Sequence, residues 1–261
     1  LAEVPIEVDY IIHAANSPDN RFHFSRPFES MTTVAEGMSA LMRAASFAPN
    51  LQKVINLSSS SVYSLDKNND EKFSEQKQGF AFNHKLSSCF GESMRYAELL
   101  GLAARNEFRL PVVNIRPFTF CGAYGSLDSP WALNNFINDA VNERSINILG
   151  NGSTIRSYMY GADLAAWILV IMLHSEDGKT YNVGNSDSFS LIEIAQKVSS
   201  CFQPSPSVLL NTSLTSKGNN SFLLPDVSNT QKDFGLINYT GIDTAIKRTV
   251  DWHQKDLNLK R

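Results

Sequence analysis

The stretch Lys85–Glu98, which reads KLSSCFGESMRYAE, determines how the rest of the chain is interpreted. It predicts the first turns of a helix that runs from about Leu86 to Arg105. Phe90 and Met94 are four residues apart, and residues at this spacing lie on one face of a helix. Taken alone, this pattern predicts that both side chains are buried in a hydrophobic core.

Segments typical of buried strands alternate with segments typical of amphipathic helices over the first half of the chain. Apolar runs at Val8–Ala15, Lys53–Leu57 and Leu110–Pro117 predict strands. A helix is predicted to begin near Pro27, because proline is favoured in the first helical turn. The alternation predicts an α/β fold with a parallel sheet and helices on both faces. The pattern after Trp131 is more broken, which predicts a smaller lobe.

Composition and charge exclude several classes of function. Of the 261 residues, 43% are hydrophobic and 19% are charged, and the formal net charge of -3 gives no reason to expect nucleic-acid or anionic-membrane binding. The longest apolar run, Ala162–Leu173, contains Asp163 and is too short to span a bilayer. Cys89, Cys121 and Cys201 have no metal-ligand spacing and the histidines form no cluster, so we predict no metal site. We expect reduced thiols and a cytoplasmic location.

Further motifs accompany the opening stretch in a fixed order. They are HAA at His13–Ala15, SSSSVY at Ser58–Tyr63, RPF at Arg116–Phe118, GNGSTIRSY at Gly150–Tyr158, DLA at Asp163–Ala165, YNVG at Tyr181–Gly184 and PDVS at Pro225–Ser228. Together they resemble the extended short-chain dehydrogenases, the NAD-dependent sugar-nucleotide epimerase/dehydratase family, over nearly the whole chain. The resemblance implies a Rossmann-like sheet, NAD(H) as cofactor and a UDP-, dTDP-, CDP- or GDP-linked sugar as substrate.

The resemblance also implies which positions carry catalysis. In this family the sugar carbon that bears a hydroxyl gives a hydride to NAD while a tyrosine removes the hydroxyl proton, and a lysine four residues later lowers the tyrosine pKa. A serine or threonine hydroxyl orients the substrate oxygen, and Ser59 falls at that position. Phe90 falls at the tyrosine position and has no proton to exchange. Met94 falls at the lysine position and carries no charge. The chain is therefore expected to be catalytically inactive.

The resemblance assigns the remaining candidate residues to the cofactor or to the substrate. The cofactor side comprises His13, Ala14, Ala15, Ser58, Pro117 and Phe118, and the substrate side comprises Thr119, Asn135 and Arg156. Arg156 is the strongest of these, because a fixed guanidinium suits a diphosphate. The alternative for Arg156 is an ordinary surface arginine. Asn135 is the weakest candidate.

One motif of the family has no counterpart in this sequence. The Gly-x-x-Gly-x-x-Gly turn, which cradles the cofactor pyrophosphate, is approached only by Gly122 and Gly125, with Asp128 at the third position. We therefore expect a sheet that begins at the family's fourth strand and is incomplete, with residues 8–15 at an open edge. In this interpretation residues 1–130 form the later part of the NAD-binding domain. Residues 131–261 form mainly a substrate-binding lobe, with some segments returning to the main sheet. NAD binding by this chain is then doubtful.

Three hypotheses remain open after these observations. The chain is an inactive form of an epimerase, dehydratase, decarboxylase or reductase; a non-catalytic nucleotide-sugar-binding pseudoenzyme or partner subunit; or a structural subunit. Ser60 and Ser61 stand where dehydratases of the family have Asp-Glu, which lowers the weight of a dehydratase reaction. The resemblance also implies a homodimer through the helix that contains Phe90. The open edge implies a separate chain that completes the sheet, unless the sequence is a fragment.

Overall fold

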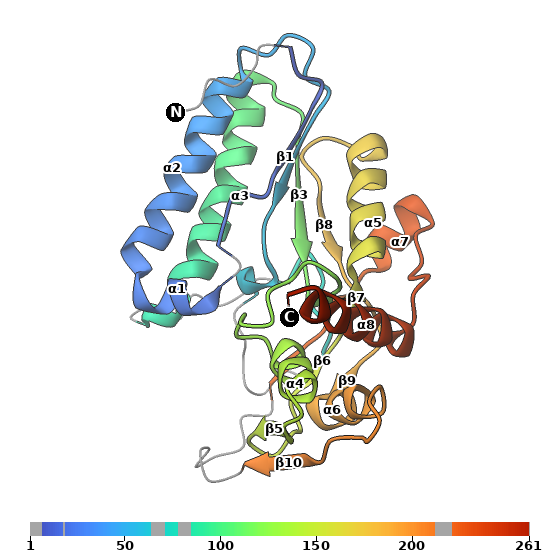
Figure 1. Ribbon diagram of the computed structural model, residues 1–261. Helices are drawn as coiled ribbons and strands as arrows, with labels where there is room; N and C mark the ends of the chain where they lie inside the picture. Colours follow the sequence, from blue (N-terminus) through green and yellow to red (C-terminus); the bar gives the residue numbers. More distant parts are fainter. Residues whose placement is uncertain (1–6, 18, 64–70, 78–84, 212–220, 261) are drawn as a thin grey trace.

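The main sheet has four parallel strands in the order β1-β2-β3-β8. Their bounds are β1 Tyr10–His13, β2 Lys53–Leu57, β3 Val112–Pro117 and β8 Thr180–Val183. This computed structural model describes residues 7–17, 19–63, 71–77, 85–211 and 221–260. The parallel sheet with helices on both faces confirms the predicted α/β architecture (Figure 1). Strand β1 is shorter than predicted.

Helices α2 (Pro27–Ala45) and α3 (Cys89–Phe108) cover one face of the sheet. Pro27 lies in the first turn of α2, as predicted. The predicted helix from Leu86 begins as a short 3-10 turn, η2 (Leu86–Ser88), and continues as α3. A core of side chains from both helices and the sheet joins them; it includes Val34, Met38, Met42, Met94, Ala97, Ala104, Val54 and Val112.

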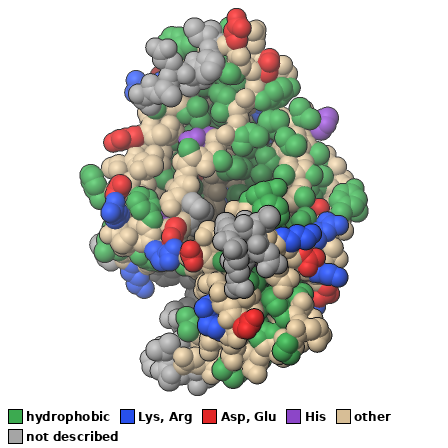
Figure 2. All heavy atoms as spheres, in the orientation of Figure 1, with side chains coloured by type: hydrophobic (Ala, Val, Ile, Leu, Met, Phe, Trp, Pro, Cys, Tyr) green, Lys and Arg blue, Asp and Glu red, His purple; other side chains and the backbone are tan. Residues whose placement is uncertain are grey.

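Helix α5 (Gly161–His174) covers the opposite face of the sheet. Its inner side chains, among them Leu164, Trp167 and Ile171, pack against Ile55, Val113 and Ile115 of the strands. Its outer side is exposed, and Figure 2 shows hydrophobic side chains gathered over this part of the surface. Within the described ranges, we find no helix with the length and apolar character needed to cross a membrane.

A second hydrophobic core lies beyond the carboxyl end of the main sheet. Helices α4 (Ala132–Val141), α6 (Leu191–Ser199) and α8 (Ile242–Lys260) pack around a parallel pair, β5 (Ile146–Leu149) and β10 (Val208–Asn211). Helix α6 begins with a capping box, in which the Ser190 and Glu193 side chains bond each other's backbone N–H groups. In this part of the fold the three helices cover the two strands.

Several short elements connect the two cores. They are α1 (Asn20–Ser25), η1 (Ser60–Val62), β4 (Phe120–Cys121), β6 (Ile155–Arg156), β7 (Met159–Tyr160), β9 (Phe189–Ser190), β11 (Phe222–Leu223) and α7 (Ser228–Phe234). The sequence did not predict them, because segments of two to seven residues are too short to show a clear hydrophobic period.

A buried ion pair joins α3 to β3 near the centre of the molecule. Arg116 donates from Nε to Glu98 Oε1 at 2.9 Å and from Nη2 to Glu98 Oε2 at 2.6 Å. Its Nη1 donates to the Tyr63 hydroxyl at 2.8 Å and to the Glu75 carbonyl at 3.1 Å. Tyr63 donates in turn to Asn182 Oδ1 on β8 at 2.7 Å. The bidentate geometry fixes the guanidinium of Arg116. This one side chain therefore forms hydrogen bonds with α3, with Tyr63 after η1 and with Glu75.

Replacing Glu98 with glutamine would leave Arg116 as a buried charge without its ionised partner. We expect Glu98→Gln to lower the free energy of unfolding by about 3 kcal/mol, as for other broken buried pairs. Urea denaturation followed by circular dichroism measures the loss. Glu29→Gln is the control, because Glu29 pairs with Arg26 at the exposed surface and such pairs contribute about 0.5 kcal/mol. Equal losses in the two variants would contradict a central role for the buried pair.

Candidate functional site

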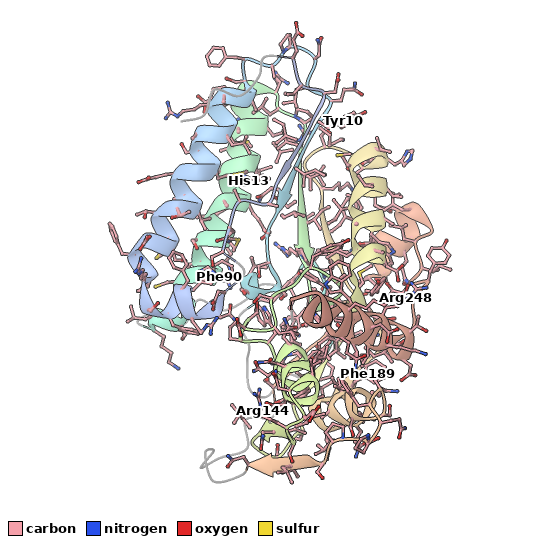
Figure 3. The ribbon with its side chains drawn as sticks, viewed as in Figure 1. Tyr10, His13, Phe90, Arg144, Phe189 and Arg248 are labelled. Atoms are coloured by element: carbon pink, nitrogen blue, oxygen red, sulfur yellow. The ribbon has the colours of Figure 1, made fainter. Side chains whose placement is uncertain are left out.

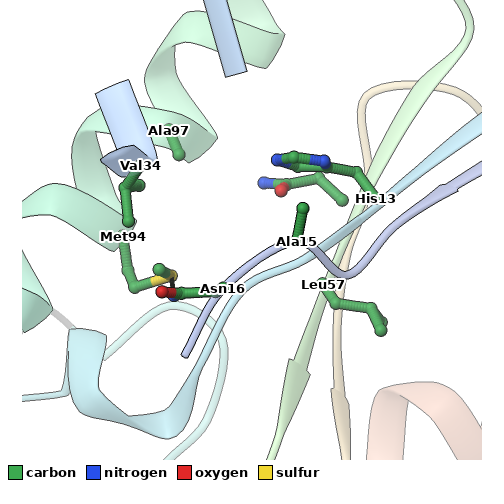
Figure 4. Close-up of a pocket in the computed structure, with 8 residues that line it drawn as sticks. His13, Ala15, Asn16, Val34, Leu57, Met94 and Ala97 are labelled. Atoms are coloured by element: carbon green, nitrogen blue, oxygen red, sulfur yellow. Dashed lines mark hydrogen bonds between the residues drawn. The ribbon is translucent and has the colours of Figure 1, made fainter. Parts of the chain in front are cut away.

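A small pocket lies where the carboxyl ends of β1 and β2 meet α2 and α3. Its lining consists of His13, Ala15 and Asn16 from β1 and the turn after it, Asn56 and Leu57 from β2, Val34 from α2, and Met94 and Ala97 from α3 (Figure 4). The pocket has room for about one water molecule and is partly open to solvent. In open α/β sheets, ligands bind at the carboxyl ends of the strands, so the position of this pocket favours ligand binding.

His13 is the single titratable side chain among the lining residues. Burial lowers its pKa, so its imidazole is neutral at about pH 7. Met94, on the other side of the pocket, is only 4% exposed. The Asn16 side-chain amide approaches Met94 Sδ at 3.8 Å, a weak contact because a thioether is a poor acceptor. Helix α3 therefore supplies no positive charge to the pocket.

Phe90 lies one helical turn before Met94 and is not part of the pocket lining (Figure 3). Its half-buried ring stacks on the His23 imidazole, with 3.8 Å between ring centroids and 17° between ring planes. His23 Nε2 donates to the Ser17 carbonyl at 3.0 Å, so in the neutral ring Nδ1 accepts from the Ser30 hydroxyl at 2.7 Å. Burial lowers the pKa of His23 and favours this neutral form. A neutral aromatic pair thus occupies this end of α3.

Two serines follow the end of β2. Ser59 caps the turn η1, since its hydroxyl accepts from Ser61 N at 3.1 Å and donates to Ser61 Oγ at 3.0 Å. Ser58 Oγ is buried and has no hydrogen-bond partner in the part of the chain that the structure describes. Leaving a buried hydroxyl unsatisfied costs free energy. Ser58 is therefore a candidate contact for a bound ligand.

The first turn of α3 lies directly against η1. A Cβ atom on Gly91 would come within 2.5 Å of the Ser61 carbonyl oxygen, a distance that real Cβ atoms do not adopt. Glycine at this position permits the close approach. The contact places Phe90, one residue earlier, beside the turn that Ser59 begins.

The structure brings three of the predicted site residues, His13, Ala15 and Met94, together in the pocket. The others lie outside its lining: Ala14 and Asn135 are exposed, Ser59, Phe90, Pro117, Thr119 and Arg156 are half-buried, and Ser58 and Phe118 are buried. The sequence reasoning missed Val34, Asn16, Asn56, Leu57 and Ala97 as lining residues, and it missed His23. Their places at strand ends could have identified Asn16, Asn56 and Leu57. No pattern in the sequence indicates the position of His23.

Arg156 lies in β6, and its guanidinium is held in place by its neighbours. Its Nη1 donates to the Ile155 carbonyl at 2.7 Å and to the Ser221 carbonyl at 2.9 Å, and Nη2 donates to Ser221 Oγ at 2.8 Å. Burial lowers the pKa of Arg156. These bonds use three of the five N–H donors of the guanidinium. The remaining two donors are compatible with an anionic ligand.

The fold is that of a Rossmann-like α/β protein, and its pocket lies at the carboxyl ends of the parallel strands, where such folds bind ligands. A family model supports the same class. The NAD dependent epimerase/dehydratase family model matches residues 1–184, so the chain belongs to this family. The predicted family is confirmed.

Curated relatives match nearly the whole chain at low identity. The dTDP-D-glucose 4,6-dehydratase of Mus musculus is 24% identical over 259 residues, which cover 97% of this chain and 69% of the mouse protein. A trifunctional UDP-glucose 4,6-dehydratase/epimerase/reductase of Arabidopsis thaliana is 25% identical, over 96% of this chain and 37% of the plant protein. The chain thus spans about a third to two thirds of these relatives.

Solved structures confirm the fold. An epimerase from Methanothermobacter thermautotrophicus superposes with a TM-score of 0.85 at 19% identity, over 96% of this chain and 73% of that protein. A Tyr-to-Phe variant of Bacillus cereus UDP-glucuronic acid 4-epimerase, in complex with NAD and UDP-4-deoxy-4-fluoro-glucuronic acid, superposes with a TM-score of 0.81 at 20% identity. The match covers 96% of this chain and 76% of that protein.

The residues around the pocket fit only part of an NAD molecule. Ala15 and Ala97 present only methyl groups to the pocket at the strand ends. Met94 provides neither a charge nor a hydrogen-bond donor. The fit is therefore incomplete in the residues present.

The contact between Gly91 and η1 gives a direct test of the site geometry. We expect Gly91→Ala to lower the free energy of unfolding by about 2 kcal/mol, because the added methyl meets backbone that cannot move freely. Gly37→Ala in α2 is the control. A Cβ at Gly37 has no neighbour within 4 Å, so alanine should raise stability by about 0.5 kcal/mol. Urea denaturation measures both changes, and a stable Gly91→Ala protein would contradict the close packing.

Proposed function

We propose that this chain binds a nucleotide sugar in the epimerase/dehydratase fold and does not catalyse the proton transfer that hydride exchange requires. The observation that supports this most directly is the composition of α3. At the two positions that the family uses for proton transfer, α3 presents Phe90, stacked on His23, and Met94, buried beside the pocket. The chain is thus a binding protein, or a partner subunit, on an enzyme scaffold.

The chemistry of alcohol oxidation gives the physical reason. NAD, when bound, accepts a hydride from the sugar carbon, and the hydroxyl proton must leave to a base at the same time. A phenyl ring has no ionisable proton, and a thioether is not a base at neutral pH. His13 is the one titratable group in the pocket lining, so an experiment on catalysis must include a variant of His13.

Ligand binding without this proton transfer has support from one neighbour. The Bacillus cereus epimerase variant with phenylalanine in place of a tyrosine was crystallised with NAD and a UDP-sugar. In that protein a Tyr-to-Phe change is compatible with both ligands. For this chain we infer nucleotide-sugar binding with Arg156 on the diphosphate. Since Met94 offers NAD neither a charge nor a hydrogen-bond donor, we infer that NAD has fewer contacts with α3 than a lysine at that position would give.

Calorimetric titration with UDP-, dTDP-, CDP- and GDP-linked sugars tests the proposal. We expect one class to bind, and Arg156→Ala to weaken that binding about tenfold, because a charge-assisted pair to the diphosphate is lost. Arg144→Ala is the matched control, since Arg144 is a more exposed arginine paired with Asp139. If Arg156→Ala bound the sugar as tightly as the unmodified chain, the contact of Arg156 with the diphosphate would be contradicted. If none of the four sugar classes gave a heat of binding, the proposed function would be contradicted.

The same protein, mixed with NAD and the bound sugar, should form no NADH by ultraviolet absorbance and no altered sugar by chromatography. Turnover by the unmodified chain would overturn the proposal. If that turnover disappeared in His13→Asn, His13 would be the base and the chain would be an enzyme. A Phe90→Tyr/Met94→Lys variant that gains turnover would show that these two positions alone had removed activity.

We further propose that the chain forms a homodimer through α3. Tyr96, Leu99 and Leu102 lie along one side of this helix and are 49%, 64% and 53% exposed. Their three-residue spacing gives a continuous apolar stripe on the side that faces away from the sheet. A second copy can bury this stripe against its own equivalent, as in the two-fold dimers that the family resemblance implies. A cytoplasmic location and the boundary near residue 130 stay predictions.

Light scattering after size exclusion tests the dimer. We expect a mass of two chains for the unmodified protein and of one chain for Leu99→Glu, because a charge would be buried at the centre of the stripe. Leu209→Glu is the control, since Leu209 is an exposed leucine on β10, far from α3 in the fold. A monomeric unmodified chain would contradict the homodimer.

A further inference from the structure

Residues 71–77 form a segment, which we call the strap, that joins the core under α3 to the chain directly after β11. Its Phe73 is 3% exposed and packs in that core. Phe73 N donates to the Leu224 carbonyl at 2.9 Å, and Asp226 N donates to the Phe73 carbonyl at 2.9 Å. The backbone of the strap thus pairs in parallel with this chain, through a bridge between Phe73 and Pro225.

Glu75 fixes the strap with its side chain and with its backbone. Its Oε1 accepts from Asn182 N on β8 at 2.9 Å, and its Oε2 accepts from Asn229 Nδ2 on α7 at 2.8 Å. Its carbonyl accepts from Arg116 Nη1 at 3.1 Å. Both carboxylate oxygens are therefore engaged by donors from two different elements. The half-buried carboxylate holds the strap against β8 and α7 at the same time.

The chain that the strap holds is continuous with the residue that fixes Arg156. Ser221 precedes β11, and its carbonyl accepts from Ile155 N at 3.0 Å and from Arg156 Nη1 at 2.9 Å. Its hydroxyl accepts from Arg156 Nη2 at 2.8 Å. Strand β11 pairs in parallel with β6, and the strap bonds the residues that follow β11. One end of residues 221–226 is thus held by the strap, and the other end orients the Arg156 guanidinium.

We propose that Glu75 is a positioning residue for the contact of Arg156 with a diphosphate, and that it acts through residues 221–226. This inference rests on the proposed function, in which Arg156 binds the diphosphate of a nucleotide sugar. A guanidinium recognises phosphate oxygens only when its donors point at them. A displacement of about 1 Å weakens such a site, so the contacts that lock the binding side chain help to set its affinity.

Two substitutions at Glu75 separate the geometry of its contacts from its charge. Alanine removes both side-chain hydrogen bonds. Glutamine keeps both, because its oxygen can accept from Asn182 N and its NH₂ group can donate to Asn229 Oδ1 once that amide turns over. A positioning role therefore predicts that Glu75→Ala loses the effect and Glu75→Gln retains it.

Calorimetric titration with UDP, dTDP, CDP and GDP measures the effect on binding. For a diphosphate that binds the unmodified chain, we expect Glu75→Ala to weaken binding about fivefold. In the Arg156→Ala background the same substitution should change binding by less than about twofold, because the side chain that it positions is gone. Glu71→Ala is the matched control, since Glu71 lies in the strap with an 85% exposed side chain and pairs with Lys77 at 3.5 Å.

Hydrogen exchange tests the same inference without a ligand. We expect the Ile155 amide, which donates to the Ser221 carbonyl, to exchange about tenfold faster in Glu75→Ala. The Ile146 amide is the reference, because it also begins a strand and donates to a parallel partner, the Ser207 carbonyl, at 2.8 Å. Its exchange should not change. If circular dichroism shows that Glu75→Ala does not fold, Asn229→Ala replaces it in both measurements, since it removes one of the two carboxylate contacts.

Four results would overturn the proposal. They are an unchanged diphosphate affinity or an unchanged Ile155 exchange in Glu75→Ala, an equal rise in exchange at Ile155 and Ile146, an equal loss of affinity with and without Arg156, and a loss in Glu75→Gln as large as in Glu75→Ala. The last would assign the effect to the charge. If no diphosphate binds the unmodified chain, the proposed function fails, and the exchange comparison alone decides whether Glu75 positions Arg156.

Discussion

The buried contact between Arg116 and Glu98 is the interaction on which the rest of the structure depends. A charge pair in a protein interior is tolerated when its geometry is good and its other donors are satisfied, and both conditions hold here. Through Tyr63 the pair reaches Asn182 on β8, whose amide donates to the Phe73 and Asp226 carbonyls. The sheet, α3 and the connection to the second core are therefore held in one hydrogen-bonded network.

This network fixes the orientation of α3 without using the groups that the family employs in catalysis. Glu98 lies one helical turn beyond Met94, so the anchored part of α3 adjoins the pocket. Gly91 and Ser61 fix the beginning of the same helix against η1. Residues 90 and 94 take no part in these two contacts, although Met94 packs in the core that joins α3 to the sheet and Phe90 packs against that core.

The main sheet and the long helices followed from the sequence, because their signals are long and periodic. The strand at Lys53–Leu57 has the predicted bounds, since an apolar run between turns leaves little freedom in where a strand begins and ends. Val8–Ala15 was predicted too long, because a strand ends where its ladder partner ends and β2 supplies only part of that length. Of the site, the resemblance around Phe90 and Met94 predicted a role for Met94, and the structure places Met94 in the pocket lining; the role itself stays a prediction.

Contacts between distant segments could not be predicted in the same way. His23 lies under Phe90 because α1 and the turn η2 pack together, and neither element leaves a period in the sequence. The environment of Arg156 depends on Ser221, which a motif around residue 156 does not contain. These features arise from tertiary packing, for which one sequence supplies no local signal.

The stack of Phe90 on His23 limits the partners that a group added to the phenyl ring could find. The imidazole is held by Ser17 and Ser30 in one tautomer, and its face is occupied by the phenyl ring. Both ring nitrogens of His23 are therefore already engaged. A hydroxyl placed on the ring of residue 90 would find no free hydrogen-bonding nitrogen on this imidazole.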